Sequence, residues 1–150
     1  MEISELYKLF LQHPQVTTDS RDCPAGSIFF ALKGESFDGN KFAELAIDKG
    51  CSYAVVDEAE YVKPDDGRFI MVDDCLKALQ QMANYHRREL GTKIIGITGT
   101  NGKTTIATLL YQLFRKLGYK VGLLSTVCNY VDGCAIEATH TTPDALHLNA

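Results

Sequence analysis

The sequence lacks the features that mark membrane, secreted and nucleic-acid-binding proteins. No apolar run approaches the roughly 18 residues of a membrane span, and the N-terminal MEISELYKLF carries acids where a signal peptide carries basic residues. The net charge is −4, and no basic cluster exists beyond Arg87 and Arg88. Nucleic acid is therefore not an expected partner. These absences predict a cytoplasmic protein that binds neither a membrane nor nucleic acid.

The cysteines lack the spacing of a disulfide framework or a zinc site. They are odd in number, and no two form a CxxC pair. Most lie among apolar residues, which predicts reduced and packed thiols at Cys23, Cys51, Cys75, Cys128 and Cys134. The chain also lacks internal repeats and low-complexity segments. What remains is an ordinary globular chain of 150 residues, of which 45% are hydrophobic and 23% charged.

Predicted helices and strands alternate along the first 90 residues, which indicates an α/β fold. Apolar residues at helical spacing predict helices over residues 2–12, 42–49 and 74–90, the last capped by Asp73 or Asp74. Short apolar runs predict a brief strand after Pro14 and buried strands over 28–32, 52–56 and 68–72.

Gly91 and Thr92 interrupt this pattern, and we place a domain boundary there. Residues 1–91 are expected to form a small α/β domain, and residues 92–150 to open a second domain with a parallel sheet. The elements predicted for the second domain are a buried strand at Ile94–Ile97, a helix over 103–117, a strand over 119–126 and a hairpin turning at Asp132–Gly133. Counted from Ile94, 57 residues are fewer than the roughly 100–150 of a self-sufficient unit, so we expect this domain to be incomplete.

The segment ITGTNGKTTIATLL has the order of residues that a triphosphate needs. A predicted strand leads into a loop in which Gly99 and Gly102 let backbone N–H groups turn inward, and a helix follows. Lys103 is placed to reach the β and γ phosphates, and the Thr104 hydroxyl to bind Mg²⁺. The generic GxxxxGK[ST] pattern would put its first glycine at Ile97, so the match is imperfect. The alternative is a glycine-rich turn before an ordinary helix.

GITGTNGKTT resembles the nucleotide loop of the Mur ligase family, ATP-dependent enzymes that extend UDP-N-acetylmuramic acid precursors of the bacterial cell wall. The resemblance implies that Lys103 is catalytic, that Thr104 binds Mg²⁺, and that ATP lies on Gly99, Thr100, Asn101, Gly102, Lys103, Thr104 and Thr105. In such enzymes ATP phosphorylates the terminal carboxylate of the UDP-N-acetylmuramoyl peptide. The amine of an amino acid or of D-alanyl-D-alanine then displaces phosphate from the acyl phosphate.

A second segment, TTDSRDCPAGSIFFALKGESFDGNKF, resembles the uridine-nucleotide domain of the same family. The resemblance places Ser20 and Arg21 at the UDP end of the substrate, with Asp38, Gly39 and Asn40 near it. A hydroxyl, a guanidinium and loop amides suit a pyrophosphate and a uracil edge. The family often has His where this chain has Asn40. Taken without the family, the Asp-Ser-Arg tripeptide would be a surface turn.

A third segment, STVCNYVDGCAIEATHTTPDALHL, resembles the region after the nucleotide helix in the ligases that add the third peptide residue, lysine or diaminopimelate. The resemblance implies that Thr141, Thr142 and Pro143 contact the muramyl-peptide substrate and that Asn129 lies in a loop beside the site. His140 and His147 are assigned to the surface, with no metal.

The two ends of the chain resemble different members of the family. Residues before about 100 look like the ligase that adds D-alanyl-D-alanine, and residues after it look like the third-residue ligase. The chain therefore reads as a composite joined near GITGTNGKTT, and natural recombination, an artificial fusion and an unusual relative all remain open.

The resemblance implies a UDP-substrate-binding domain over 1–91 and the N-terminal part of the central ATP-binding domain over 92–150. The family's third domain, its downstream metal ligands and its modified lysine are absent, so we expect an N-terminal fragment without ligase activity of its own. The alternative function is a non-catalytic module that binds a UDP-sugar or a nucleotide. A P-loop kinase or GTPase is a lesser alternative, because no later acidic strand end or guanine-recognition motif follows the loop.

Overall fold

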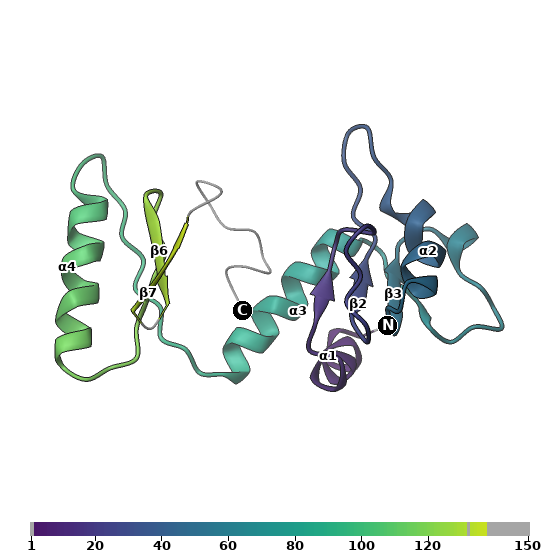
Figure 1. The fold of residues 1–150 in the computed structure, drawn as a ribbon, viewed down its shortest axis with the longest axis horizontal. Helices are drawn as coiled ribbons and strands as arrows, with labels where there is room; N and C mark the ends of the chain where they lie inside the picture. Colours follow the sequence, from purple (N-terminus) through teal and green to yellow (C-terminus); the bar gives the residue numbers. More distant parts are fainter. Residues whose placement is uncertain (1, 132, 138–150) are drawn as a thin grey trace. The chain divides into compact units, whose positions relative to one another are not determined.

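The structure is a computed structural model that describes residues 2–131 and 133–137. It contains two compact units, of which the first ends at Gly91 and the second begins at Thr92. Figure 1 shows α1 to α3 with their sheet in purple to teal, and α4 with its strands in green to yellow.

The first unit is built on a four-stranded parallel sheet in the order β1-β2-β3-β4. The strands are β1 (Val16–Thr17), β2 (Ile28–Phe30), β3 (Tyr53–Val56) and β4 (Phe69–Met71). In register, Phe29 pairs with Ala54, and Ala54 pairs with Phe69. The strands expected in this unit are confirmed, with β2 and β4 shorter than their apolar runs.

Between residues 2 and 91 the structure has three α-helices and two short 3-10 helices, which precede, connect and follow these strands. They are α1 (Ile3–Gln12), η1 (Gly39–Phe42), α2 (Ala43–Asp48), η2 (Ala59–Tyr61) and α3 (Cys75–Glu89). α1 packs against α3, and α2 packs against β3. Of the two candidate caps, Asp74 is the N-cap of α3, and its Oδ1 accepts a hydrogen bond from the N–H of Lys77 at 2.9 Å. Within the described residues, no helix has the length and apolar character to cross a membrane.

The core of the first unit lies where β2 and β3 meet the helices. Ile28, Phe29 and Phe30 are completely buried, as are Val55 and Val56. These strands read as continuous apolar runs because a parallel sheet covered on both faces buries alternate side chains on each side. This rigid sheet positions the loops that follow its strands.

Over residues 92–131 and 133–137, the second unit has one helix and an antiparallel sheet. α4 (Lys103–Lys116) is followed by β5 (Gly122–Leu123), β6 (Cys128–Val131) and β7 (Cys134–Glu137), in the order β5-β6-β7. The predicted hairpin is confirmed, since Val131 pairs with Cys134 and Gly133 has a φ of +94°. Asp132, the other expected turn residue, lies outside the described residues.

The prediction of a buried parallel strand at Ile94–Ile97 is wrong. This segment forms no strand, and the side chains of Ile94 and Ile95 are each 60% exposed. The strand expected over 119–126 is reduced to β5, which pairs antiparallel with β6. A buried strand needs neighbours for its N–H and C=O groups, and the described part of the chain offers none beside Ile94–Ile97. The same lack leaves an apolar stripe exposed at Ile106, Leu109 and Leu113 of α4 and at Leu117, which caps its C-terminal end.

Candidate functional site

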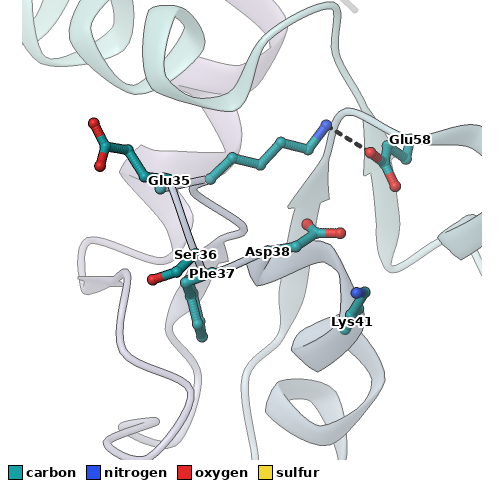
Figure 2. A pocket seen from close by; sticks show the side chains of 8 residues that line it. Glu35, Ser36, Phe37, Asp38, Lys41 and Glu58 are labelled. Atoms are coloured by element: carbon teal, nitrogen blue, oxygen red, sulfur yellow. Dashed lines mark ion pairs between the residues drawn. The ribbon is translucent and has the colours of Figure 1, made fainter.

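A cavity of about 360 Å³ lies at the loop that follows β2 in the first unit. Its lining comes from that loop, the start of η1 and the segment after β3: Lys33, Gly34, Glu35, Ser36, Phe37, Asp38, Lys41 and Glu58. Figure 2 shows Glu35 and Glu58 at opposite sides, with Asp38 between them. Ligands of parallel α/β sheets bind beyond the carboxyl ends of the strands, and this cavity occupies such a position.

Charged side chains of both signs face this cavity. The Lys33 ammonium lies 2.8 Å from Oε1 of Glu58, the pair dashed in Figure 2, and 2.9 Å from Oδ1 of Asp57. The carboxylates of Glu58 and Asp57 together raise the pKa of Lys33 above its ordinary value. Burial alone would raise the pKa of Asp57, but hydrogen bonds from Lys33, Asn40 and the N–H of Cys75 hold it below its ordinary value.

Asp38, Gly39 and Asn40, expected near the UDP, occupy three different environments. Asp38 lines the cavity, and a hydrogen bond from Asn40 lowers its pKa. Gly39 is buried, with its N–H donating to the Leu32 carbonyl at 3.0 Å. Asn40 is completely buried, and its amide is bonded to Asp38 and Asp57. A direct side-chain contact from Asn40 to a substrate does not fit this burial, so Asn40 supports the loop from within.

Ser20 and Arg21 lie in a loop after β1 and are not among the described residues that line the cavity. Ser20 is buried, and its carbonyl accepts a hydrogen bond from the Lys49 ammonium at 2.8 Å. The Arg21 side chain is 88% exposed and forms an ion pair with Asp19 at 2.7 Å. The hydrogen bond from Arg21 lowers the pKa of Asp19 to about 2. Arg21 therefore presents its guanidinium to solvent, held by one carboxylate.

The second candidate site is the loop before α4. Gly99 has a φ of +145°, and Gly102, the N-cap of α4, has a φ of +78° and a ψ of 0°. L residues rarely adopt these angles, so glycine is required for this backbone path. The N-cap provides no side-chain hydrogen bond, and the first turn holds no acidic residue. The N–H groups at this helix end are thus left to an anion or to water.

Lys103 and Thr104 occupy the first turn of α4. The Lys103 ammonium turns back onto the loop and donates to the carbonyl of Gly99 and, at 3.3 Å, to that of Thr100. Thr104 is exposed, as are Asn101 and Thr105. The seven residues expected to hold ATP are consecutive and exposed, with Gly99–Gly102 in the loop and Lys103–Thr105 at the start of α4.

Of the four residues expected at the substrate in the second unit, the structure describes Asn129, and Pro143 lies outside the described residues. Asn129 lies within strand β6 rather than in a loop, and its Oδ1 accepts a hydrogen bond from the N–H of Ser125 at 3.2 Å. Thr141 and Thr142 lie outside the described residues. The loop expected around Asn129 is a strand because the hairpin begins at Cys128.

Sequence reasoning did not find Lys33, Lys41, Asp57 or Glu58. Lys33, Asp57 and Glu58 directly follow the strands predicted over 28–32 and 52–56, and that position is the signal that points to them. Lys41 lies in η1, just before the helix predicted over 42–49, and carries no such signal. Among the described residues, no group of three or more His, Cys, Asp or Glu is placed to hold a metal ion.

Two family models match the chain. The model described as "Mur ligase family, catalytic domain" matches residues 14–87, and "Mur ligase middle domain" matches residues 97–150. Together they cover both units and leave only short segments at the N-terminus and between them.

Curated relatives match across both halves of the chain. The UDP-N-acetylmuramoyl-L-alanyl-D-glutamate–2,6-diaminopimelate ligase of Parabacteroides distasonis is 46% identical over 137 residues, which is 90% of this chain and 28% of the relative. The ligase of the same name from Cytophaga hutchinsonii is 48% identical over 134 residues, 87% of this chain and 28% of the relative. The chain thus spans somewhat more than a quarter of the length of these relatives.

A solved structure of the other ligase type also matches. The MurF ligase of Thermotoga maritima, crystallised in complex with ADP, has a TM-score of 0.58 and 25% identity, over 68% of this chain and 23% of that protein. Both ligase types expected from the sequence therefore occur among the matches. Because each diaminopimelate ligase matches on both sides of the nucleotide loop, one ligase type accounts for both halves without a composite origin. The chain belongs to the Mur ligase family.

Proposed function

We propose that the chain forms part of an ATP-dependent ligase that extends a UDP-N-acetylmuramoyl peptide by an amide bond. The names of the two relatives favour the addition of 2,6-diaminopimelate to UDP-N-acetylmuramoyl-L-alanyl-D-glutamate over the addition of D-alanyl-D-alanine. We assign recognition of the UDP end to the unit that ends at Gly91, and ATP binding to the unit that begins at Thr92.

The observation that carries the proposal is the loop from Gly99 to Thr105. Its two positive-φ glycines, its uncapped helix end and the Lys103 ammonium form a cationic turn without a carboxylate in the first helical turn. Such a turn stabilises the negative charge of phosphate groups, and Lys103 is assigned to the phosphoryl group that is transferred. Binding an anion requires the Lys103 ammonium to leave the carbonyls of Gly99 and Thr100.

Mg²⁺ fits the same turn through Thr104. Magnesium in phosphate sites takes one or two protein oxygens and completes its shell with phosphates and water. The exposed Thr104 hydroxyl at the first turn of α4 supplies one such oxygen. When bound, the ion neutralises charge on the phosphates.

The cavity of the first unit suits one end of a uridine diphosphate. Lys41 supplies positive charge, and the Lys33 ammonium is held by Asp57 and Glu58 at the edge of the cavity. Asp38 and Glu58 accept hydrogen bonds, and the exposed Phe37 ring stacks on Phe42 with centroids 5.3 Å apart. A pyrimidine base prefers an aromatic face with hydrogen-bonding groups at its edge. Arg21 is the further cation that we assign to the diphosphate.

A titration with MgATP tests the ATP-binding assignment. The 150-residue chain is expected to bind MgATP, and Lys103→Met is expected to weaken that binding about tenfold or more, because a charged hydrogen-bond donor to phosphate is lost. Lys116→Met removes the same charge from the last turn of α4 and serves as the control. Equal affinity of both variants for MgATP would contradict the assignment.

A non-catalytic UDP-sugar-binding module is the second candidate. It is favoured by the contrast between the units, since the first has a closed core and the second leaves Ile94, Leu109 and Leu117 about 60% exposed. Binding of UDP-N-acetylmuramoyl-L-alanyl-D-glutamate without binding of MgATP would support the module. We expect no ATP-dependent amide formation by the 150-residue chain, and detectable formation would refute that expectation.

A further inference from the structure

The buried amide of Asn40 joins two carboxylates in the first unit. Its Nδ2 donates to Oδ1 of Asp38 at 3.0 Å and to Oδ1 of Asp57 at 2.9 Å. Its Oδ1 accepts the backbone N–H of Asp57 at 3.0 Å. Every hydrogen-bonding group of the side chain except one oxygen lone pair is thus used, so Asn40 fixes the end of β3 against the start of η1.

Asp57 is the residue on which these contacts converge. Its Oδ1 accepts from Asn40 and from the Lys33 ammonium at 2.9 Å, and its Oδ2 accepts the N–H of Cys75 at 3.2 Å. Cys75 is the first residue of α3, where the positive end of the helix dipole favours a carboxylate. Asp57 therefore ties together the loop after β2, the end of β3 and the beginning of α3.

The loop held by Asp57 is the one that lines the cavity. Lys33 and Asp38 form an isolated antiparallel bridge across its base, and the N–H of Gly34 donates to the carbonyl of Phe37 at 2.8 Å. Asp57 holds both sides of this base: it forms an ion pair with Lys33, and it accepts a hydrogen bond from Asn40, which also donates to Asp38. The Asp57 side chain is only 12% exposed and is not among the cavity-lining residues, so it reaches the cavity through its partners.

We propose that Asp57 is a positioning residue for substrate binding, which sets the placement of Lys33 and Asp38 at the cavity through its contacts with Lys33 and Asn40. This proposal rests on the proposed function, because it takes the cavity as the UDP-binding site. Asp57 holds the two groups in place before a ligand arrives, which lowers the entropy that binding must remove.

The test is a thermodynamic cycle on affinity for UDP-N-acetylmuramoyl-L-alanyl-D-glutamate, measured by calorimetry on the 150-residue chain. Asp57→Asn keeps the size of the side chain and removes its charge, and it is expected to weaken binding about tenfold or more. In a Lys33→Met background the same change is expected to have a clearly smaller effect, because Asp57 acts partly through Lys33. A residue that only stabilises the fold would weaken binding equally in both backgrounds.

Asp74→Asn provides the matched control. It removes the same charge at the N-cap of α3 and touches no cavity residue, so its affinity for the probe is expected to equal that of the unmodified chain. Amide exchange across residues 33–38 is a second readout that needs no ligand, and it also covers the case in which Asp57→Asn is poorly folded. The Lys33 side chain is 42% exposed, so Lys33→Met should not disturb the core. Loss of the ion pair with Asp57 is expected to speed amide exchange across residues 33–38 in this variant.

The outcomes separate the two proposals. Binding by the unmodified chain with no loss in Asp57→Asn, or with equal losses in both backgrounds, would overturn the positioning role and leave the proposed UDP site intact. No binding by the unmodified chain would overturn both. Exchange across residues 33–38 that is unchanged in Asp57→Asn and Lys33→Met would also overturn the positioning role.

Discussion

Gly39→Ala should be the most damaging small substitution in the first unit. A Cβ built on Gly39 lies 2.6 Å from the carbonyl oxygen of Leu32 and 2.8 Å from two further backbone atoms, the Ala31 carbonyl carbon and the Leu32 nitrogen. Ordinary contact begins at 3.4 Å, so the two backbone segments would have to separate by about 0.8 Å. No flexible side chain can absorb this shift, because all three neighbours are backbone atoms.

The cost has two sources. Forcing an extra methyl group into a packed site typically costs about 1–3 kcal/mol. The separation also stretches the hydrogen bond from Gly39 to Leu32 and the adjoining Asn40 contacts, each worth about 0.5–1.5 kcal/mol. We therefore expect a loss of about 2–4 kcal/mol, which lowers the Tm of a unit of this size by at least about 10 °C.

Gly34→Ala is the matched control in the same loop. A Cβ at Gly34 meets nothing within 4 Å, and its φ is not positive, so the change is expected to be neutral or stabilising by up to about 1 kcal/mol. Thermal unfolding followed by circular dichroism compares the variants, and amide exchange in β2 reports on the first unit alone. If Gly39→Ala were as stable as Gly34→Ala, the close approach at Leu32 would be refuted.

Three further predictions follow from the same contacts. The pKa of Asp57 is lowered in the folded chain, so its contribution to stability is complete above its unfolded pKa of about 3.9 and is lost as the pH falls through the folded value. The free energy of unfolding, measured with urea, should therefore fall more between pH 5 and pH 3 for the unmodified chain than for Asp57→Asn. An equal fall in both would contradict this. Amides of Ile94–Ile97 should exchange rapidly and those of Phe29 and Phe30 slowly, whereas protection of both would indicate a strand at Ile94–Ile97. Arg21→Ala should leave the Tm unchanged, because its ion pair is exposed, but should weaken binding of the UDP-peptide in calorimetry; unchanged affinity would exclude Arg21 from the site.

The first unit could be predicted from the sequence because its structural signals are local. Each strand is a short apolar run bounded by turn residues, and each helix has apolar spacing with a recognisable end, such as Asp74 before α3 or Gly50 after α2. The partners of those strands also lie nearby in the chain, since β1 to β4 pair in sequence order. Local signals and sheet order therefore agree.

The same reasoning failed at Ile94–Ile97 because a strand is not a local property. The run KIIGIT has the composition of a buried strand, but a strand exists only where another strand pairs with it. Of the strands described after Thr92, β5, β6 and β7 pair with one another. The composition of an apolar run therefore shows that a segment can form a strand, but not that a partner strand lies beside it.

The two candidate sites also differ in whether their residues are close together in sequence. The turn from Gly99 to Thr105 could be proposed as a site residue by residue, because its glycines, lysine and hydroxyls lie within one short segment. Lys33 and Asp57 were not predictable, because they are 24 residues apart in sequence and meet only through the parallel pairing of β2 with β3. Asn40 lies in a recognisable loop, but nothing in the sequence indicates that its side chain is buried and bonded to Asp38 and Asp57.

The departure from the family pattern at position 40 has a physical reason in these contacts. Asn40 donates two hydrogen bonds from one nitrogen to Asp38 and Asp57, and accepts a third from the backbone of Asp57. A neutral imidazole has one N–H and one acceptor nitrogen, and an imidazolium has two N–H groups that point in different directions and no acceptor. Neither form can reproduce all three contacts from the place of one amide. Histidine at position 40 would thus lose at least one of the three contacts that Asn40 makes with Asp38 and Asp57.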